Sequence, residues 1–473
     1  MTDVSKIPET KADNEGINRT TAYNIISTFL VQGITFLTIP VFTRVLGADQ
    51  YGTYSVIYSW VILLGGVLDC GVGSTIGTGR YRFSGEYEAF RTGILKMILL
   101  FGTVTSVLLF LLSLIFPAIW DCSPVMMIMI LAMSLGRAVV LYQQSCYIYE
   151  KKAKKNLILS LILVGSTVAL SLIGVFLMDP SERYVGKVAG EMIPYVTIAL
   201  VISIVVLVRY PAKWKKEHVR FALVVGFPIV FHELARNVLN QADRVMMRWM
   251  DQPESEIGIY SLFFSLASVL NVVLLALNNS WCPFYYDDLN EEKTEDLKRK
   301  TKNYVELFSV LMVGFLLVSR EVGYLMADES YYGGMDILPV FVAAVFFIFV
   351  YMFYVNAEFF YRKTIVIAVG SAMAAVVNIV LNYLMIGRYG MYGAAIATTI
   401  SYAALALFHF ICLKRIRKNF YLKVAAFLPG ILSLGIGVAA FYLLADLWVI
   451  RWLLAALVGA FELYRLFKRK TIF

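Results

Sequence analysis

Two stretches of this sequence, Gly52-Thr-Tyr-Ser-Val-Ile-Tyr-Ser59 and Gly258-Ile-Tyr-Ser-Leu-Phe-Phe-Ser265, repeat each other at an offset of 206 residues. The register continues over seventeen positions, of which seven are identical. A second pair of segments matches at an offset of 207 through Gly186/Gly393, Tyr195/Tyr402, Ala199/Ala406 and Leu200/Leu407. Two offsets that agree this closely indicate that one half of the chain repeats the other.

The repeated segments belong to long apolar runs. Hydrophobic residues make up 59% of the 473-residue chain, charged residues make up 16%, and the mean hydropathy is +0.72. A run of about 18 or more apolar residues can cross the hydrocarbon core of a membrane as a helix, which satisfies its own backbone hydrogen bonds. The sequence therefore predicts an all-α integral membrane protein with fourteen spans, at residues 22–43, 53–79, 93–116, 124–149, 157–178, 188–208, 221–248, 257–282, 304–326, 336–361, 365–386, 393–412, 424–445 and 449–467.

The repeat predicts how these spans are grouped. Matching spans are six apart, an even number, so the two copies have the same orientation and are related by an axis along the membrane normal. This arrangement favours two parallel six-helix lobes around a central cavity, as in alternating-access transporters. We expect a cytosolic tail at 1–18, an N-lobe at 19–210, a C-lobe at 211–415, and two further helices with a cytosolic tail at 416–473.

The basic residues predict the topology. Lys and Arg number 31 in the N-terminal tail and the even-numbered connections, and eight on the other side. Positive charge accumulates in cytoplasmic loops, so both termini are predicted to be cytosolic. The net charge of +9 then reflects topology and gives no reason to expect a nucleic-acid partner.

Cofactor and metal signals are missing from the sequence. The five cysteines are scattered, without a CxxC pair or a neighbouring histidine cluster, so we expect no metal and no disulfide framework. There is no GxxxxGK[ST] phosphate-binding loop. We therefore expect no cofactor. We expect the energy for transport to come from an ion gradient or from consumption of the product.

A few ionisable residues lie deep in the predicted spans, where they are costly unless they face a cavity or a partner. These residues are Asp69, Arg137, His232, Glu233 and Arg236. In span seven, one helical stripe consists of His232, Arg236, Asn240 and Asp243, and a second of Glu233, Asn237, Gln241 and Arg244. A helix with so wide a polar face must line water or another polar helix.

These residue types suggest binding of a phosphorylated sugar. Guanidinium groups bind phosphate oxygens in a bidentate fork, and amides hydrogen-bond to sugars. The predicted substrate-binding residues are Arg137, Arg236, His232, Asn240, Gln143 and Gln144. The predicted ion-coupling residues, for H⁺ or Na⁺, are Asp69 and Glu233.

Structural roles are the alternative for several of the same groups. Glu233 with Arg236, and Asp243 with Arg244, would then neutralise each other as ion pairs. Glu191, Glu358 and His409 lie near predicted span ends and are expected at the membrane interface.

Several segments resemble Wzx-type polysaccharide flippases of the MOP superfamily over roughly residues 18–417. The segments that carry the resemblance are Leu46-Gly-Ala-Asp-Gln-Tyr-Gly52, Asn240-Gln-Ala-Asp-Arg244, residues 256–268, Ala276-Leu-Asn-Asn-Ser-Trp-Cys-Pro-Phe-Tyr-Tyr286 and Gly390-Met-Tyr-Gly-Ala-Ala-Ile-Ala-Thr398. The resemblance implies a two-lobed transporter in a bacterial plasma membrane. Its implied substrate is an undecaprenyl-diphosphate-linked oligosaccharide, such as an O-antigen repeat unit, moved from the inner to the outer leaflet.

The resemblance also implies partners: membrane lipids, the coupling ion, and the polysaccharide polymerase machinery that takes up the product. Other substrates stay open, because the same superfamily contains the lipid II flippase and multidrug exporters. A membrane polysaccharide polymerase or ligase is a further alternative. Such an enzyme needs a sizeable outer loop, and all connections here are short, so we expect no enzyme activity.

Overall fold

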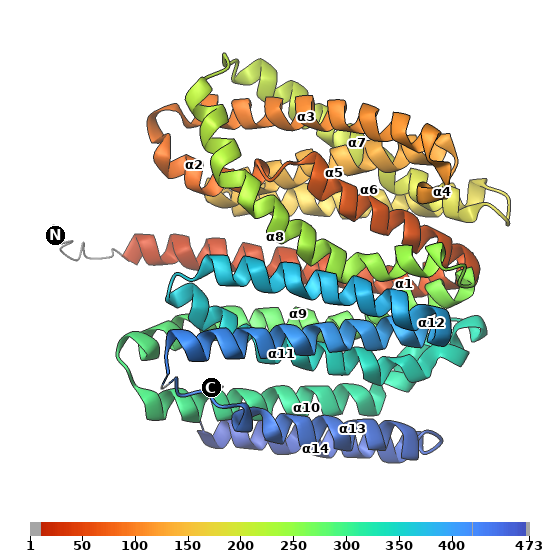
Figure 1. The fold of residues 1–473 in the computed structure, drawn as a ribbon, viewed down its shortest axis with the longest axis vertical. Coiled ribbons are helices and arrows are strands. Elements are labelled where there is room, and N and C mark those ends of the chain that lie inside the picture. The colour runs from red at the N-terminus through yellow and green to blue at the C-terminus, as the bar shows by residue number, and fades with distance from the viewer. Residues whose placement is uncertain (1–10, 419, 470–473) are drawn as a thin grey trace. The chain divides into compact units, whose positions relative to one another are not determined.

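The computed structural model describes residues 11–418 and 420–469, and these form helices and no strands. Twelve of the helices are long, and within each of the two compact units described below they run nearly side by side (Figure 1). They are α1 (Lys11–Leu68), α3 (Tyr87–Ile115), α5 (Pro124–Tyr149), α6 (Ala153–Leu177), α7 (Arg183–Arg209), α8 (Lys216–Trp249), α9 (Glu254–Asn290), α10 (Thr294–Met326), α11 (Leu338–Phe360), α12 (Thr364–Ile416), α13 (Leu428–Leu443) and α14 (Trp448–Arg469). Two short helices, α2 (Ile76–Arg82) and α4 (Pro117–Trp120), complete the α-helical set.

Two of the long helices are broken at a glycine. In α1 the backbone is non-helical at Gly47 (φ 69°), and in α12 at Gly390 (φ 52°), a left-handed region that glycine enters without steric cost. At about 1.5 Å per residue, the 58 residues of α1 and the 53 of α12 would each be far too long for one crossing. Each therefore provides two membrane-length segments, and the predicted total of fourteen is confirmed.

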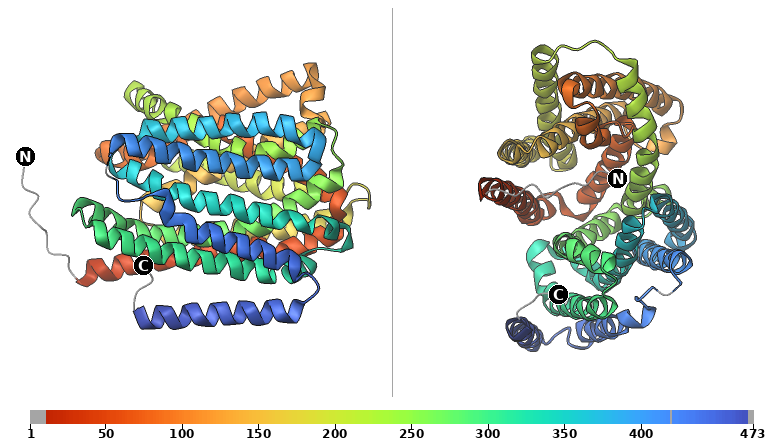
Figure 2. Two further views of the ribbon diagram at one scale, coloured as in Figure 1. Left: turned by 60° about the horizontal axis from the view of Figure 1, so that its bottom comes forward. Right: turned by 90° about the vertical axis from the view of Figure 1, so that its left-hand side faces the viewer.

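Ten helices in the described part of the chain are long and apolar enough to cross a membrane, and α10 and α14 are not among them. These two carry charges that meet each other: Arg451 of α14 pairs with Glu321 of α10, and Arg465 and Arg469 pair with Glu306. Both Figures 1 and 2 show α13 and α14 beside α10. Charges that would be costly in lipid are thus neutralised between neighbouring helices.

The chain forms two compact units, Met1–Val41 with Ile57–Leu234 (unit 1) and Phe42–Val56 with Ala235–Phe473 (unit 2). Unit 1 packs α3, α5 and α7 around buried residues such as Phe90, Ile94 and Tyr142. Unit 2 packs α9 to α13 around Phe263, Phe308 and other buried aromatic residues. The predicted lobe boundaries stay a prediction. The first ten residues of the predicted tail lie outside the described residues, and α1 already begins at Lys11.

The glycines of the sequence repeat lie where helices cross at backbone distance. A Cβ atom on Gly52 would lie 1.9 Å from the carbonyl oxygen of Glu254, and one on Gly258 would lie 2.0 Å from that of Ala48. The two repeat copies of this glycine therefore face each other within unit 2. The second repeated pair behaves alike, because a Cβ on Gly186 or on Gly393 would also meet a backbone carbonyl oxygen, at 2.2 and 2.4 Å. Close helix packing accounts for this part of the repeat.

Candidate functional site

Arg137 is held inside unit 1 by tyrosines. It lies partly buried in the middle of α5, and its guanidinium hydrogen-bonds with the hydroxyl groups of Tyr58 and Tyr195. Its aliphatic stem approaches the backbone of α1, with Cδ 4.0 Å from the position of a Cβ on Gly65. Among the described residues, no carboxylate forms an ion pair with Arg137. Its positive charge is solvated by hydroxyl groups but not neutralised, as an anion-binding group requires.

Arg236 on α8 occupies a similar setting in unit 2. It is exposed and interacts electrostatically with Tyr351 of α11 and Tyr402 of α12. The backbone oxygen of Arg236 accepts a hydrogen bond from the side-chain amide of Asn240 (2.8 Å), and the Tyr402 hydroxyl donates to Oδ1 of Asn240 (2.9 Å). Tyr402 is the repeat counterpart of Tyr195. Each unit therefore places one repeat-matched tyrosine beside its mid-span arginine.

The other two predicted site residues of α8, His232 and Glu233, are half-buried. They lie one turn before Arg236, at the end of the segment assigned to unit 1. Both take part in interactions with other residues. Their roles in substrate binding and ion coupling stay predictions.

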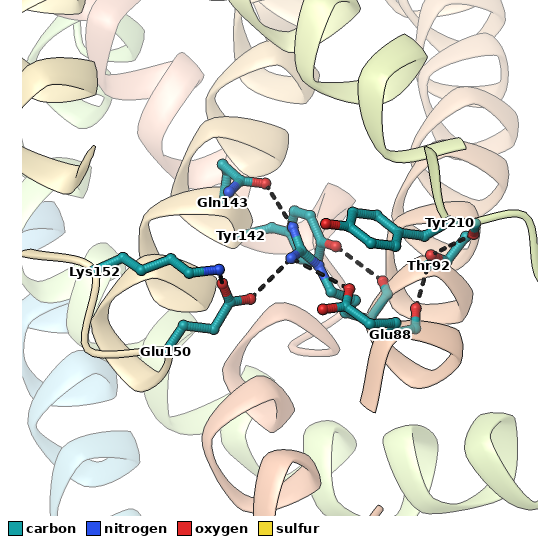
Figure 3. A network of polar contacts seen from close by, with 8 residues as sticks. Glu88, Thr92, Tyr142, Gln143, Glu150, Lys152 and Tyr210 are labelled. Atoms are coloured by element: carbon teal, nitrogen blue, oxygen red, sulfur yellow. Dashed lines mark hydrogen bonds and ion pairs between the residues drawn. The ribbon is translucent and has the colours of Figure 1, made fainter. Parts of the chain in front are cut away.

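The two glutamines of α5 hold helices together within unit 1. Gln143 is buried and accepts a hydrogen bond from Nη2 of Arg91 on α3 (3.2 Å), as Figure 3 shows. The amide of Gln144 donates to Oγ of Ser160 on α6 (3.0 Å). Both contacts are internal, so a role for these glutamines in substrate binding stays a prediction.

Arg91 is the centre of that network. Its Nη1 donates to Oε1 of Glu150 (2.8 Å), and the Lys152 ammonium donates to Oε2 of the same carboxylate (2.5 Å; Figure 3). The Tyr142 hydroxyl donates to the backbone oxygen of Arg91 (2.9 Å). Glu150 follows the last residue of α5, so this ion pair fastens the end of α5 to α3. Sequence reasoning missed the pair because its two members lie 59 residues apart.

Asp69 lies in the turn that follows α1. Its Oδ1 accepts a hydrogen bond from the backbone amide of Gly73 (3.3 Å), and a Cβ atom on Gly73 would come within 2.7 Å of that oxygen. The described residues supply no cationic partner for this carboxylate. The structure is therefore compatible with the predicted coupling role of Asp69 and does not test it.

A polar cluster in unit 2 was not predicted. The Asp243 carboxylate of α8 is fully buried and accepts hydrogen bonds from Tyr260 of α9, from Nδ2 of Asn382 (2.6 Å) and from Oγ1 of Thr398 (2.7 Å). Nδ2 of Asn382 also donates to Oδ1 of Asn378 one turn away (3.1 Å). Two asparagines four residues apart in an apolar span were the available sequence signal.

The expected ion pair between Asp243 and Arg244 does not form. Arg244 turns instead to Oγ of Ser261 (3.0 Å) and to the backbone oxygen of Asn240 (2.9 Å), and its guanidinium lies over the ring of Phe264. Neighbouring residues on a helix point about 100° apart, so adjacent opposite charges readily find separate partners.

The cluster around Asp243 (Asp243, Asn378, Asn382 and Thr398) has one carboxylate and several neutral oxygen atoms. Hard cations prefer oxygen ligands, and a buried carboxylate can alternatively bind a proton. Oδ1 of Asn382 is buried without a hydrogen-bond partner among the described residues. In the described part of the chain, this cluster included, no group of three or more His, Cys, Asp or Glu side chains could hold a metal ion.

A second buried pair lies near the ends of α11 and α12. Nδ1 of His409 is 2.7 Å from Oε2 of Glu358, and both side chains are enclosed by protein. These residues were expected at the membrane interface; they lie near helix ends but are buried. Lys187 and Glu191 of α7 form an ion pair at 2.8 Å.

Comparison with known proteins identifies a group with this architecture. The family model described as "Polysaccharide biosynthesis protein" matches residues 17–285. An uncharacterized membrane protein of Haemophilus influenzae is 21% identical over 356 residues, which cover 73% of this chain and 84% of that protein. An Lsg locus protein of the same organism is 22% identical over 176 residues, 36% of this chain, and the match spans only 43% of that protein.

Solved structures share the fold. The lipid II flippase MurJ in an inward closed conformation matches with a TM-score of 0.68 and 17% identity, over 94% of this chain and 99% of that chain. An inward-facing multidrug resistance transporter of the MATE family, of the MOP superfamily, matches with a TM-score of 0.65 and 13% identity, over 85% of this chain and 99% of that chain. The chain therefore has the fold of these two proteins, the family match confirms its resemblance to polysaccharide biosynthesis proteins, and its long apolar helices indicate a multi-pass membrane protein.

Proposed function

This chain belongs to the polysaccharide biosynthesis protein family, and we propose that it is a flippase for an undecaprenyl-diphosphate-linked oligosaccharide repeat unit. The substrate moves by alternating access from the inner to the outer leaflet of a bacterial plasma membrane, with both termini in the cytosol. Polysaccharide polymerase machinery then takes up the product. The fold shared with a lipid II flippase supports a lipid-linked substrate.

The observation that carries this proposal is the setting of Arg137. Its guanidinium meets two tyrosine hydroxyl groups and no carboxylate among the described residues. A carboxylate-centred cavity would favour a cationic drug, whereas an arginine whose charge is not neutralised favours an anion. The diphosphate of a lipid carrier provides that anion. Tyrosine rings beside the guanidinium are suited to the sugar that follows the diphosphate.

The other predicted residues keep their proposed roles. Arg236, His232 and Asn240 contribute polar groups from α8, and Gln143 and Gln144 contribute from α5. Asp69 and Glu233 are the proposed sites for H⁺ or Na⁺ coupling. Replacing both by Asn and Gln is expected to remove the dependence of transport on an imposed ion gradient; an unchanged dependence would contradict the assignment.

The experiment is a flipping assay in proteoliposomes with a fluorescent undecaprenyl-diphosphate-linked oligosaccharide. Arg137→Ala should abolish flipping per folded molecule, and Arg137→Lys should retain part of it, because lysine keeps the charge but not the bidentate geometry. Arg299→Ala, which removes an exposed arginine paired with Asp296, is the control and should flip normally. Normal flipping by Arg137→Ala would remove this residue from the substrate site.

Arg236 needs a second variant, because a structural pair with Glu233 is the alternative. Arg236→Ala should abolish flipping, and the double change with Glu233→Ala should not restore it. Full rescue by the double variant would assign Arg236 to a structural pair. Lipid II and a cationic dye, tested in the same vesicles, distinguish the proposed substrate from those of the two structural relatives.

The orientation has its own test. Single cysteines at Glu182 or Pro253 should be labelled from outside the cell by a membrane-impermeant maleimide, and a cysteine at Lys154 should not. The reverse labelling pattern would contradict the proposed topology.

A further inference from the structure

Unit 1 contains a cavity of about 440 Å³ that Arg137 does not line, although Gln143, one of the predicted substrate-binding residues, does. Residues from the end of α5, the beginning of α6 and the end of α7 line it, together with Arg91 of α3. These helix ends flank Lys151, Lys152, Lys154 and Lys155, the segment that the charge count predicts to be cytosolic. The volume is in the range of small-molecule sites.

The charged part of the cavity wall is strongly cationic. Arg91, Lys152, Lys155 and Arg209 line it, and Glu150 is its one lining carboxylate. Each oxygen of Glu150 is already taken, one by Arg91 and the other by Lys152. Neither Lys155 nor Arg209 has an ion-pair partner among the described residues. The cavity therefore has an excess of positive charge that its own carboxylate does not neutralise.

Arg91 adds positive charge from within the wall of the cavity. Its side chain is 5% exposed, Nη1 donates to Glu150, and Nη2 donates to Gln143. Lys155 and Arg209 are therefore the cations of the wall that remain for a ligand, and Arg91 strengthens the positive potential behind them.

Much of the remaining wall is aliphatic, and several of its side chains face outward. Ile162 of α6 is 56% exposed, and Val201 and Val205 of α7 are 60% and 49% exposed. In a membrane-spanning unit such exposed side chains face lipid, so the cavity is continuous with the acyl-chain region. A free phosphate would leave the aliphatic side chains without an apolar partner. A lipid without a net charge would leave the excess positive charge of the basic side chains without a matching anion.

We propose that this cavity binds one anionic phospholipid of the cytosolic leaflet. Its phosphodiester lies against Lys155 and Arg209, and one acyl chain lies along Ile162, Val201 and Val205. The lipid would connect α6 and α7 at the end where Arg91 and Glu150 already join α3 to α5. The inference does not depend on which molecule the protein transports.

The test is native mass spectrometry of the purified full-length protein with phosphatidylglycerol or phosphatidylcholine of identical acyl chains. The wild type should retain one phosphatidylglycerol in preference to phosphatidylcholine. Lys155→Gln with Arg209→Gln should weaken phosphatidylglycerol binding about thirty-fold, given roughly fivefold per basic residue at a membrane surface. Lys151→Gln with Lys154→Gln removes the same charge from the same segment outside the cavity and should change binding less than threefold.

A second variant tests the aliphatic wall. Val205→Trp leaves all charges in place but fills the mouth of the cavity, and it should also lose the bound lipid. Equal retention of both phospholipids, equal loss in the two double variants, or displacement of the lipid by millimolar inorganic phosphate would each overturn the proposal. The melting temperature of each variant is measured as a control for folding.

Discussion

Glu150 of unit 1 and Glu358 of unit 2 lie near the ends of corresponding spans and have different partners. Glu150 follows the last residue of α5, the fourth span, and Glu358 lies two residues before the end of α11, the tenth span. Both carboxylates are buried, one against Arg91 at 2.8 Å and the other against His409 at 2.7 Å. Each of the two spans therefore has a buried carboxylate near its end, with a different kind of partner.

The difference concerns the chemistry of the partner. The guanidinium of Arg91 has five N–H donors in a planar fork and always carries a charge, so it binds Glu150 as an ion pair. The imidazole of His409 contacts Glu358 through a single ring nitrogen. Unit 2 also contains the buried Asp243, whose hydrogen-bond partners are Tyr260, Asn382 and Thr398. Among the described residues, neither of these two buried carboxylates of unit 2 has an arginine or lysine partner, whereas the network around Arg91 serves as a charged brace.

The largest loss of stability is expected when the ion pair between Arg91 and Glu150 is broken. Arg91→Met leaves the buried Glu150 with Lys152 alone and should destabilise the protein by about 3–5 kcal/mol. The measurement is the melting temperature and the urea or SDS unfolding curve of the protein purified in detergent. Adding Glu150→Gln should recover more than half of the loss, because the uncompensated charge is then gone.

The matched control for Arg91 is an exposed ion pair. Arg299→Met breaks the surface pair with Asp296 and should change stability by less than about 0.5 kcal/mol. If Arg91→Met were equally mild, the pair in unit 1 would not be a brace, and the contrast with unit 2 would disappear.

Packing, unlike charge, should be equivalent in the two units. Gly186 of unit 1 and Gly393 of unit 2 are repeat counterparts, and a Cβ on either would lie 2.2 or 2.4 Å from a backbone oxygen. Changing each to Ala should therefore destabilise both units similarly, by about 1–3 kcal/mol. Thermal unfolding of the two variants, side by side, measures this.

Each unit supplies its own control for the glycines. Gly165 in unit 1 and Gly435 in unit 2 are helical and have nothing within 4 Å of an added Cβ atom. Alanine there should be neutral or slightly stabilising, since it lowers the entropy of the unfolded chain. A clear loss at one repeat glycine and none at the other would show that the duplication preserved sequence but not packing.

The sequence predicted most of the fold, because hydropathy and the repeat depend on local residue types and on spacing. The fourteen segments follow from them, whereas the close helix crossings at the repeat glycines became evident only in the structure. The partners of buried charges did not follow, since they come from distant segments. Asp243 was expected to pair with its neighbour Arg244, but it bonds to Asn382 and Thr398, 139 and 155 residues away. Helical periodicity predicts on which face of its own helix a side chain lies, but not which other helix packs against that face.

The smallest effect is expected at the second carboxylate. His409→Gln removes the imidazole from Glu358, but the glutamine amide is also a hydrogen-bond donor and can replace the contact of the ring nitrogen. The loss should be about 1 kcal/mol, near the value of one hydrogen bond. The same detergent unfolding assay measures it.

A double-mutant cycle completes the comparison. With Glu358→Gln alone and with both changes together, the coupling energy in unit 2 should be smaller than that of Arg91 with Glu150 in unit 1. A His409 coupling as large as that of Arg91 would mean that Glu358 and His409 form a second brace of the same strength. The two units would then differ in the chemistry of one partner but not in how firmly a buried carboxylate is held.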